Sequence, residues 1–318
     1  MIGIGIEEYG DEQQIKTVAV PTATWGPGDL LISIKASGVN PVDWKVREGL
    51  LKTDFPYELP LILGWDAAGK VAAAGSNVTE FKVGDDVFFR PEMEKQGTYA
   101  DEIVVPAHLV APMPRGLTYA EAASLPLVGL TVWQALVEVG NVQPGQNVLI
   151  LAGSGGIGSI AIQVAKARGA YVAATTSSRN SDFVRDLGAD EVLNYDLGGM
   201  DTATEFDFML DTLGGTSYGD ALKFMKKRGT VATIISGRDA VRPDYIDALE
   251  EERQLKVSFV FTRPDGRNMN HLRELVEAGE IKPVVTEVFP LTVDGARAAH
   301  LVSKAGRTRG KIVLSAGD

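Results

Sequence analysis

The middle of the chain alternates short apolar runs with segments whose apolar residues recur at helical spacing. Residues 148–151 form an apolar run, as expected of a parallel strand buried on both faces. From Ile157 to Ala165, apolar residues recur with the spacing of one helix face, and Gly169 follows where a helix should end. Between the two lies the glycine-rich stretch 153–158. The pattern therefore predicts a strand, a tight turn and a helix, in this order.

The same alternation continues toward the C-terminus. A helix is predicted at 181–187, and further strands are predicted at 171–175, 191–194, 206–211, 230–235 and 256–261. Alternating strands and helices favour a parallel sheet, and the right-handed crossover rule makes one doubly wound sheet the natural assembly. The fold class predicted for this part is therefore α/β.

The remaining segments have strand character and indicate a separate, smaller core. Strand patterns occur at 30–36, 64–71, 83–89, 281–289 and 310–314, and a helix is predicted at 269–278. We infer a barrel-like or sandwich domain to which the C-terminal end of the chain returns. The predicted limits are 1–123 and 282–318 for this domain, with 124–281 as an inserted nucleotide-binding domain.

Helical signals also occur before the inserted domain. Asn40 is placed to cap a short helix, with Pro41 at its first position and Gly49 at its end. A helical region is predicted from Thr118 to about residue 139, broken near Pro126. The capping role would explain Asn40 without any chemistry, and it stands beside the functional role considered below.

Composition narrows the classes of function. The chain has 318 residues, a net charge of −11 and no cysteine, so disulfides, a cysteine nucleophile and zinc sites with thiolate ligands are excluded. The three histidines are scattered, and no metal is predicted. The acidic balance argues against a nucleic-acid partner, and the absence of an apolar stretch of about 18 residues argues against a membrane span. No signal peptide is recognisable, and a cytoplasmic location is expected.

The glycine-rich stretch has the spacing G-x-G-x-x-G, formed by Gly153, Gly155 and Gly158. Glycines let the chain turn tightly and let a pyrophosphate approach bare backbone, while the start of a helix offers unpaired N–H groups and a positive dipole end. Such a stretch can be only a turn, but here a strand precedes it and a helix follows. We therefore predict a dinucleotide site at Gly153, Gly155, Gly156, Ile157 and Gly158.

The residues after the second predicted strand decide which nicotinamide coenzyme is expected. NAD sites place an acid there, which binds the ribose 2′-hydroxyl. In this chain the segment 175–180 reads Thr-Thr-Ser-Ser-Arg-Asn, and the first acid is Asp182, inside the next helix. Hydroxyl groups and the guanidinium of Arg179 would hold a 2′-phosphate, which a carboxylate would repel. NADPH is therefore predicted over NADH; the alternative is that Ser177, Ser178 and Arg179 only cap the following helix in solvent.

Short motifs spread over nearly the whole chain carry a resemblance to one family. They are Gly38-Val-Asn-Pro-Val-Asp43, Leu63-Gly-Trp-Asp-Ala-Ala-Gly69, Val83-Gly-Asp-Asp-Val87, Gly97-Thr-Tyr-Ala-Asp101, Leu125-Pro-Leu-Val-Gly-Leu-Thr131, Ala152-Gly-Ser-Gly-Gly-Ile-Gly158 and Gly310-Lys-Ile-Val-Leu314. In this order they resemble the zinc-independent quinone oxidoreductases, such as zeta-crystallin, among the medium-chain dehydrogenases/reductases. The resemblance implies a GroES-like β-barrel catalytic domain and an inserted Rossmann domain with a doubly wound parallel sheet. Zinc enzymes of this family carry Cys at the position of Asn40 and a His-Glu pair at Trp65-Asp66, so catalysis without zinc is implied.

The resemblance also implies roles for residues at matching positions. Asn40 and Thr131 would approach the nicotinamide and the substrate, and Tyr57 and Trp65 are further candidates on the substrate side. The adenosine 2′-phosphate would lie near Ser177, Arg179 and Tyr195. The nicotinamide ribose end would be lined by Ser236, Gly237, Phe259, Phe261 and Lys311. As alternatives, Tyr195 could pack over a neighbouring helix, and alternating phenylalanines on a buried strand could belong to the core.

The predicted activity is NADPH-dependent reduction of quinones or α,β-unsaturated carbonyls by direct hydride transfer. Negative charge would collect on an oxygen of the substrate, where a neutral donor such as the Asn40 amide or the Thr131 hydroxyl could stabilise it. Two alternatives stay open: a specialised 2-alkenal or enone double-bond reductase that is inactive on quinones, and an NADPH-binding protein without turnover. The resemblance also implies a homodimer.

Overall fold

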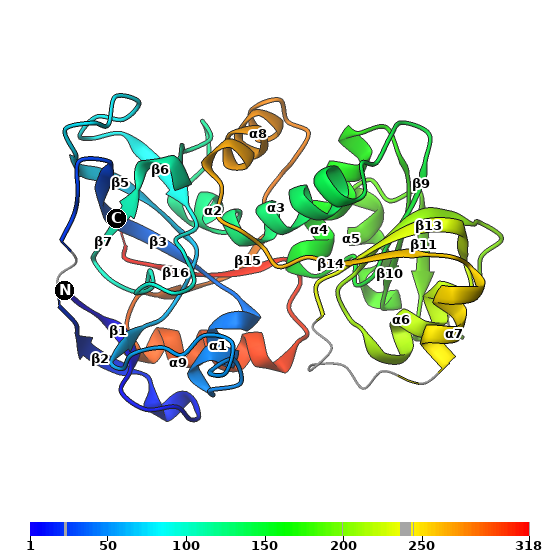
Figure 1. Cartoon of the computed structure of the whole chain (residues 1–318), viewed down its shortest axis with the longest axis horizontal. Coiled ribbons are helices and arrows are strands. Elements are labelled where there is room, and N and C mark those ends of the chain that lie inside the picture. Colours follow the sequence, from blue (N-terminus) through cyan, green and yellow to red (C-terminus); the bar gives the residue numbers. More distant parts are fainter. Residues whose placement is uncertain (22–23, 199, 236–242, 244, 318) are drawn as a thin grey trace. The chain divides into compact units, whose positions relative to one another are not determined.

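The computed structural model describes residues 1–21, 24–198, 200–235, 243 and 245–317 (Figure 1). The chain divides into two compact units. Unit 1 comprises Met1–Leu130, Arg263–Ala278 and Pro283–Asp318, and unit 2 comprises Thr131–Thr262 and Gly279–Lys282. Unit 2 is therefore inserted in the sequence of unit 1. Residues 263–278 lie in unit 1, although the sequence pattern assigned them to the inserted domain; the predicted domain limits stay a prediction.

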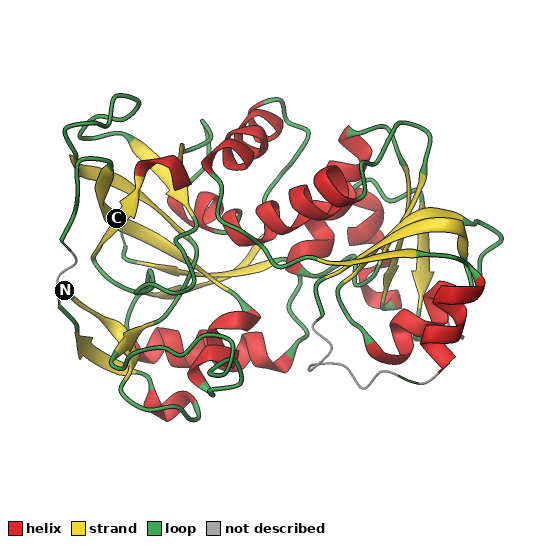
Figure 2. Ribbon diagram, viewed as in Figure 1, coloured by secondary structure: helices red, strands yellow, loops and turns green. Residues whose placement is uncertain are grey.

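Unit 2 is built on a six-stranded sheet whose neighbouring strands run parallel. The strands are β9 (Asn147–Ile150), β10 (Tyr171–Thr176), β11 (Glu191–Asn194), β12 (Phe206–Asp211), β13 (Met225–Thr233) and β14 (Lys256–Phe259). Their order across the sheet is β11-β10-β9-β12-β13-β14. Figure 2 shows the strands in yellow and the helices in red. The direction in which strands are added reverses at β9, as in a doubly wound dinucleotide-binding sheet. The predicted fold class is confirmed.

Burial explains the central strand and helix of unit 2. Val148, Leu149 and Ile150 of β9 are fully buried, so this strand is apolar on both faces, as its sequence predicted. Of the apolar positions that predicted α4, Ile160, Ala161, Val164 and Ala165 are buried, whereas Ile157 in the first turn is half-buried. The helices between the strands are α4 (Gly156–Ala167), α5 (Ser181–Asp186), α6 (Gly215–Leu222) and α7 (Tyr245–Glu252), with a 3₁₀ turn, η4, at Ser178–Asn180.

Some elements of unit 2 differ from their predicted bounds for local reasons. Strand β13 begins at Met225 rather than at residue 230, because residues 226–228 are polar and give no apolar signal even though they extend the strand. Strand β14 ends at Phe259 rather than Phe261, where its partner β13 also ends. Helices α6 and α7 were not predicted.

Unit 1 contains a three-stranded and a seven-stranded sheet. The smaller sheet has the order β2-β1-β4, and the larger has the order β15-β16-β3-β5-β6-β8 with β7 also paired to β3. The strands are β1 (Ile2–Ile6), β2 (Lys16–Ala19), β3 (Asp29–Val39), β4 (Leu61–Ile62), β5 (Ala67–Ala74), β6 (Asp86–Phe89), β7 (Glu102–Pro106), β8 (Val110–Pro112), β15 (Val285–Pro290) and β16 (Lys311–Ser315). Strand β16 pairs antiparallel with β3, with Ile312 opposite Val39. The C-terminal end therefore returns to the first sheet, and this register brings Lys311 beside Asn40.

The helices that begin in unit 1 include one that no apolar pattern had indicated. They are α1 (Pro41–Arg47), α2 (Tyr119–Ala123), α3 (Pro126–Trp133), α8 (Gly266–Glu277) and α9 (Val293–Ala305); the 3₁₀ turns are η1 (Glu12–Gln14) and η2 (Ala107–Leu109), and the π-helical stretch η3 (Gln134–Val139) follows α3. The break near Pro126 occurs as predicted. Helix α9 was not predicted, because its buried face consists of small residues and His300 rather than large apolar side chains.

Candidate functional site

The glycine-rich turn before α4 has the shape of an anion cradle. A Cβ atom on Gly158 would lie 2.2 Å from the Ala152 carbonyl oxygen, and one on Gly153 would lie 2.8 Å from the Ala174 Cβ, so the fold itself requires both glycines. A Cβ on Gly155 would meet only the Ala152 oxygen at 3.4 Å within the described chain, so the backbone at Gly155 is bare. Gly155 is the N-cap of α4 and offers no side chain to its first N–H groups, which have no partner inside the helix. These residues fit a pyrophosphate.

The turn is fastened to β10 by Thr175, a residue that the sequence analysis did not single out. The Gly153 N–H donates to the Thr175 carbonyl oxygen at 2.8 Å, and the Ala152 N–H donates to the Thr175 Oγ1 at 2.9 Å. Ala152 itself has a φ of 57°, a conformation that L-residues rarely adopt. The cradle is therefore held rigidly before any ligand is bound. A β-branched hydroxyl residue at a strand end gives no sequence signal for this role.

The residues predicted near the 2′-phosphate follow β10 and β11. Ser177 is buried and is the N-cap residue of the turn η4, although its side chain makes no capping bond there. Instead, the Asp196 carboxylate accepts from the Ser178 N–H and hydroxyl, each at 2.8 Å. Arg179 is exposed, and Tyr195 is 59% exposed.

The other predicted site residues of unit 2 are two phenylalanines at or after β14, Thr131 in α3, and Ser236 and Gly237. The side chains of Phe259 and Phe261 are 52% and 49% exposed, so the alternative that placed them in the core is wrong. Thr131 is buried, and its Oγ1 lies 2.6 Å from the Oγ1 of Thr262. Ser236 and Gly237 lie outside the described residues.

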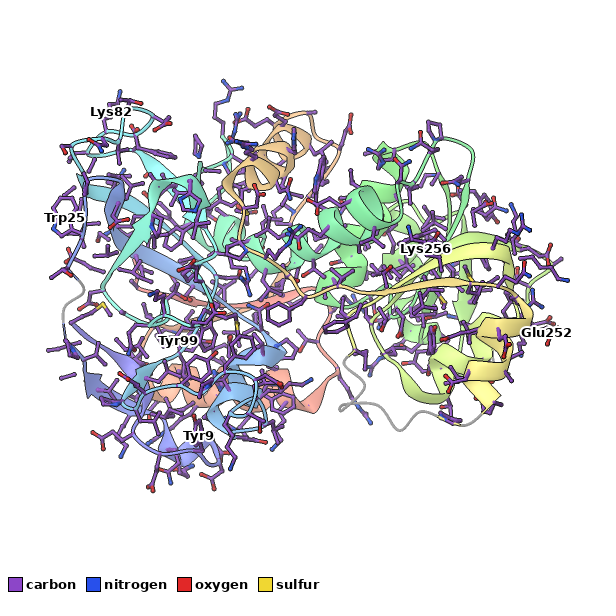
Figure 3. All side chains as sticks on the ribbon, viewed as in Figure 1. Tyr9, Trp25, Lys82, Tyr99, Glu252 and Lys256 are labelled. Atoms are coloured by element: carbon purple, nitrogen blue, oxygen red, sulfur yellow. The ribbon has the colours of Figure 1, made fainter. Side chains whose placement is uncertain are left out.

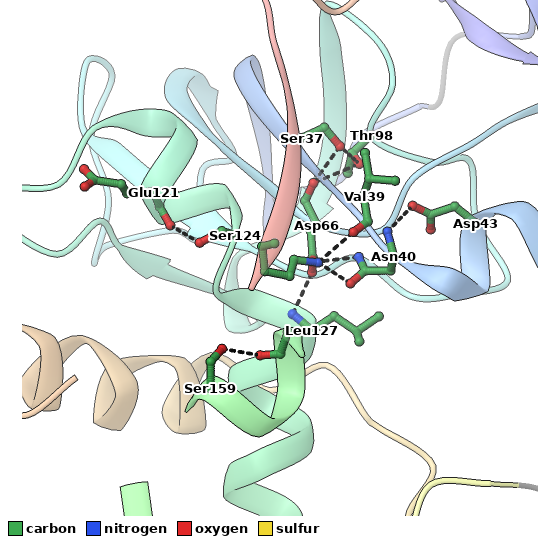
Figure 4. A network of polar contacts seen from close by, with 12 residues as sticks. Ser37, Val39, Asn40, Asp43, Asp66, Thr98, Glu121, Ser124, Leu127 and Ser159 are labelled. Carbon is green, nitrogen blue, oxygen red and sulfur yellow. Dashed lines mark hydrogen bonds and ion pairs between the residues drawn. The ribbon is translucent and has the colours of Figure 1, made fainter. Parts of the chain in front are cut away.

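In unit 1, Asn40, Asp66 and Lys311 form one buried polar network (Figure 4). The Asn40 Nδ2 donates to the Asp66 Oδ2 at 2.8 Å. The Lys311 Nζ donates to the Val39 carbonyl oxygen at 2.8 Å and to the Asn40 Oδ1, and it lies 3.6 Å from the Asp66 Oδ2. The second Asp66 oxygen accepts from the Leu127 N–H at 2.6 Å. Asn40 is the N-cap residue of α1, as predicted, and its backbone N–H donates to the Asp43 side chain in the capping box of this helix. The second N–H bond of its amide makes no hydrogen bond to the described residues.

Burial shifts the pKa of both Asp66 and Lys311, and the charge of each residue counteracts the shift of the other. Burial raises the pKa of Asp66, and the neighbouring ammonium group of Lys311 acts against that rise. Burial lowers the pKa of Lys311, and the carboxylates of Asp66 and Asp43 act against that fall. Each charge is thus stabilised by the other. The pair depends on tertiary pairing of β16 with β3, which sequence spacing could not reveal.

A second buried chain of polar groups links Asp43 to His300 through Tyr99, a residue inside unit 1 (Figure 3). The Tyr99 hydroxyl donates to the Asp43 Oδ2 at 2.8 Å and lies 3.4 Å from the His300 Nε2. The Arg47 Nη1 lies 3.3 Å from the His300 Nδ1. Because a guanidinium can only donate, Nδ1 accepts and the ring proton lies on Nε2, directed at the Tyr99 oxygen. The Asn40 backbone N–H adds a further donor to Asp43, at 2.8 Å.

Burial shifts the pKa values of Asp43 and His300, at the two ends of this series of polar groups, in opposite directions. It raises the pKa of Asp43 from 3.8 to about 7, although hydrogen bonds from the Asn40 N–H and Tyr99 act against this rise. It lowers the pKa of His300 from 6.5 to about 3, assisted by the charge of Arg47. His300 is therefore neutral at physiological pH.

We expect Asp43→Asn to change the pH dependence of stability. The folded state binds the Asp43 proton more tightly than the unfolded state, so this group lowers the free energy of unfolding as pH rises from 3.8 to about 7. His300 acts in the opposite sense as pH rises from about 3 to 6.5. The variant loses only the first effect, so its stability relative to wild type should increase with pH across this window, by at most about 1.4 kcal/mol per pKa unit.

Urea unfolding at a series of pH values measures this difference. The exposed Asp101, changed to Asn, serves as a control that should track the wild type at every pH. A difference between Asp43→Asn and wild type that stays constant from pH 4 to 8 would contradict the assignment.

Unit 1 also holds an aromatic cluster with unpaired donors. The ring of Tyr57 lies 6.1 Å from that of Phe55, in a stacked arrangement, and 6.0 Å from that of Trp65. Within the described ranges, the Tyr57 hydroxyl, the Trp65 Nε1 and the Arg90 Nε are buried without a hydrogen-bond partner. Burial raises the pKa of Tyr57, and the nearby charge of Arg90 opposes this rise. A cavity of about 430 Å³ lies beside the cluster and is lined in part by Phe55, Tyr57 and Glu94.

Arg90 is the member of this cluster that the sequence analysis missed. Its side chain is 2% exposed, and the hydrogen bond it makes to the described chain runs from Nη1 to the Pro91 carbonyl oxygen at 3.4 Å. Burial lowers the pKa of Arg90, while the carboxylates of Asp66 and Glu94 act against that change. An arginine inside a strand-end segment gives no periodic signal, because the sequence does not show that it is buried.

The residues present do not fit a zinc centre. Within the part of the chain that the structure describes, no group of three or more histidine, aspartate or glutamate residues could hold a metal ion. The Asn40 amide oxygen already accepts from Lys311, and an amide and the indole of Trp65 are poor zinc ligands. The same described part contains no helix long and apolar enough to cross a membrane.

Comparisons with known proteins agree with the fold of both units. Residues 26–115 match the family model described as "Alcohol dehydrogenase GroES-like domain", and residues 187–314 match "Zinc-binding dehydrogenase". Among solved structures, the quinone oxidoreductase of Escherichia coli complexed with NADPH superposes with a TM-score of 0.86 at 26% identity, covering 99% of this chain and 100% of the other.

Curated relatives match almost the whole chain. The mitochondrial NAD(P)H oxidoreductase RTN4IP1 of Bos taurus is 34% identical, covering 98% of this chain and 88% of the relative. The chloroplast envelope quinone oxidoreductase homolog of Arabidopsis thaliana is 30% identical over 96% and 95%, and the 2-methylene-furan-3-one reductase of Solanum lycopersicum is 34% identical over 96% and 77%. The chain therefore belongs to the medium-chain dehydrogenase/reductase family and is an oxidoreductase that uses a nicotinamide coenzyme. The family predicted from the motifs is confirmed.

The expected cytoplasmic location is wrong. The bovine relative is named mitochondrial, and the Arabidopsis relative is named for the chloroplast envelope. The expectation depended on finding no recognisable leader in this sequence. Transit segments are removed from mature proteins and leave no mark on the fold, so the composition of the folded part carries no information about them.

Proposed function

We propose that this chain uses NADPH to reduce quinones or α,β-unsaturated carbonyl compounds without a zinc ion. The observation that carries the proposal is the bare backbone at Gly155, at the start of α4, where the strand order of a parallel sheet reverses. The names of the relatives support it, since they include an NAD(P)H oxidoreductase and a quinone oxidoreductase homolog.

Bound NADPH would supply a hydride from its nicotinamide ring. The first N–H groups of α4, from Gly156, Ile157 and Gly158, would hold its pyrophosphate at the positive end of the helix dipole. Arg179 supports NADPH over NADH, because an exposed guanidinium is a bidentate partner for a phosphate. Tyr195 has the exposure needed to lie beside the adenosine.

The aromatic cluster of unit 1 supports a carbonyl substrate. Buried donors without a partner raise the free energy of the folded protein unless an acceptor reaches them. The oxygens of a quinone or an enone can only accept hydrogen bonds, which matches the hydroxyl of Tyr57, the indole N–H of Trp65 and the guanidinium of Arg90. The flat ring of a quinone also suits the stacked rings of Phe55 and Tyr57.

These residues would act chiefly by positioning and by stabilising charge. A fixed donor at the oxygen where negative charge develops contributes about 3 kcal/mol to the transition state. Arg90 supplies a buried positive charge, and the second N–H bond of the Asn40 amide, which has no partner among the described residues, is a further donor. Thr131 stays a candidate through its hydroxyl. The proton can then come from water, since none of the described residues is arranged as an obligatory acid.

A second candidate function is a double-bond reductase that acts on enones but not on quinones. The tomato relative, a 2-methylene-furan-3-one reductase, is 34% identical and favours this candidate. Both functions use the same coenzyme and the same developing oxygen charge, so they differ only in the shape of the substrate that reaches the donors.

A substrate panel tests the proposed function. NADPH oxidation should be followed with 1,4-benzoquinone, 9,10-phenanthrenequinone and a series of 2-alkenals, on enzyme dialysed against a metal chelator. We expect turnover with at least one quinone. Turnover with the alkenals alone would favour the second candidate, and tight NADPH binding with no turnover on any compound would favour a non-catalytic role.

Tyr57→Phe is expected to separate stability from activity. Removing a buried hydroxyl that has no partner should leave the free energy of unfolding unchanged or raise it by about 1 kcal/mol. The same change removes a donor to the substrate oxygen, so kcat/KM for the quinone should fall by about 10- to 100-fold, with the KM for NADPH unchanged. Tyr171→Phe, at the start of β10, is the control that should alter neither quantity. An unchanged kcat/KM in Tyr57→Phe would exclude this residue from the substrate site.

A further inference from the structure

The acid that the sequence analysis did not find after β10 is supplied by another strand. Asp196 lies two residues beyond the end of β11, and β11 is the parallel neighbour of β10. Its carboxylate accepts from the backbone N–H of Ser178 at 2.8 Å through one oxygen, and from the Ser178 hydroxyl at 2.8 Å through the other. Both donors of Ser178 are therefore occupied by a carboxylate.

This carboxylate occupies groups that could otherwise bind the 2′-phosphate of NADPH. Phosphates in proteins are bound by backbone N–H groups, hydroxyls and guanidinium groups. Ser178 offers the first two and Arg179, the next residue, offers the third. A phosphate that reached Ser178 would have to displace Asp196 or bind close to its negative charge.

Asp196 keeps its charge under ordinary conditions. The hydrogen bonds from Ser178 lower the pKa of Asp196, and the positive charge of Arg179 adds to this effect. Arg179 thus lies within electrostatic reach of both Asp196 and the expected phosphate. A bound 2′-phosphate would therefore share the charge of this guanidinium with Asp196.

We propose that Asp196 is a coenzyme-selectivity residue that opposes the 2′-phosphate of NADPH and so limits the preference for NADPH over NADH. The role is the one that an acid at the end of the second strand has in NAD sites, supplied here from the end of the third strand. This inference rests on the proposed function, since it requires a coenzyme at the glycine-rich turn of unit 2.

The alternative is that Asp196 has a purely structural role and only caps the turn η4. The two interpretations differ in what the charge does. Asp196→Asn keeps an oxygen that can accept from the Ser178 N–H and removes the negative charge. A purely structural residue would affect NADPH and NADH alike, whereas a selectivity residue changes the ratio of their affinities.

The test is the dissociation constants of NADPH and NADH for the full chain, measured by titration calorimetry at low and high salt. In Asp196→Asn we expect NADPH to bind about five- to tenfold more tightly relative to NADH than in wild type, with the gain reduced at high salt because the charge is exposed. Asp182→Asn is the matched control: this exposed acid lies on α5 close in sequence, but it pairs with Arg185 rather than Ser178. It should leave the ratio unchanged.

An unchanged ratio in Asp196→Asn, with both coenzymes still bound, would overturn this inference alone. An equal change in Asp182→Asn would overturn it too, since the effect would then come from the general charge of this surface. If the wild type bound neither coenzyme, the proposed function would be wrong, and this inference, which depends on it, would be wrong as well.

Discussion

Gly155→Ala is expected to weaken NADPH binding by about 100-fold and to leave the free energy of unfolding within about 0.5 kcal/mol of wild type. The backbone of Gly155 has φ −79° and ψ 177°, which any residue can adopt. Its added Cβ would meet the described chain only at 3.4 Å, at the Ala152 oxygen. The methyl group would instead occupy the space in which a pyrophosphate must approach the amides of α4. Calorimetric titration with NADPH and urea unfolding measure the two quantities.

Gly158→Ala is the matched comparison within the same turn. A Cβ at this position would lie 2.2 Å from the Ala152 carbonyl oxygen, which the fold cannot accommodate without moving backbone. We expect this variant to lose NADPH affinity together with about 1–3 kcal/mol of stability. If Gly155→Ala bound NADPH as tightly as wild type, the coenzyme would not lie against this turn.

Lys311→Met is expected to reduce the free energy of unfolding by about 3–5 kcal/mol, because it leaves the charge of Asp66 buried without a partner. The Asp66 side chain is fully buried, and the Lys311 ammonium lies 3.6 Å from its Oδ2. Lys311 also donates to the Asn40 Oδ1, so the variant removes this hydrogen bond in addition to the charge. Urea unfolding at pH 7 gives the value.

The double variant Asp66→Asn/Lys311→Met separates charge from packing. Removing both charges should recover a large part of the lost stability, since no buried ion is left unpaired. A loss below about 1 kcal/mol in Lys311→Met would mean that water or another cation compensates Asp66, and the buried pair described here would be wrong.

The doubly wound sheet could be predicted because each of its signals is local. The apolar run at 148–151 marks a strand buried on both faces, and the helical spacing that follows marks α4. The glycines between them are required by steric contacts with residues of the same turn and the next strand, such as Ala152 and Ala174. Helix α9 lacks such a signal, because its buried face is made of alanines and a histidine.

The partners of the site residues could not be predicted, because they are brought together only by tertiary pairing. Asn40, Asp66 and Lys311 are far apart in the sequence and meet through the register of β3 with β5 and β16. Asp196 reaches Ser178 across two neighbouring strands, and no search of the segment after β10 would find it. Arg90 showed no pattern at all, since burial of a single charged residue leaves no trace in periodicity.

We propose above all that this chain passes a hydride from NADPH to a carbonyl-containing substrate without a metal ion. The most direct test is the rate of NADPH oxidation by 9,10-phenanthrenequinone on chelator-treated enzyme, compared between unlabelled NADPH and NADPH deuterated at C4 of the nicotinamide. We expect turnover that persists after chelation and is slower with the deuterated coenzyme. Activity that vanished on chelation and returned with added zinc would contradict it.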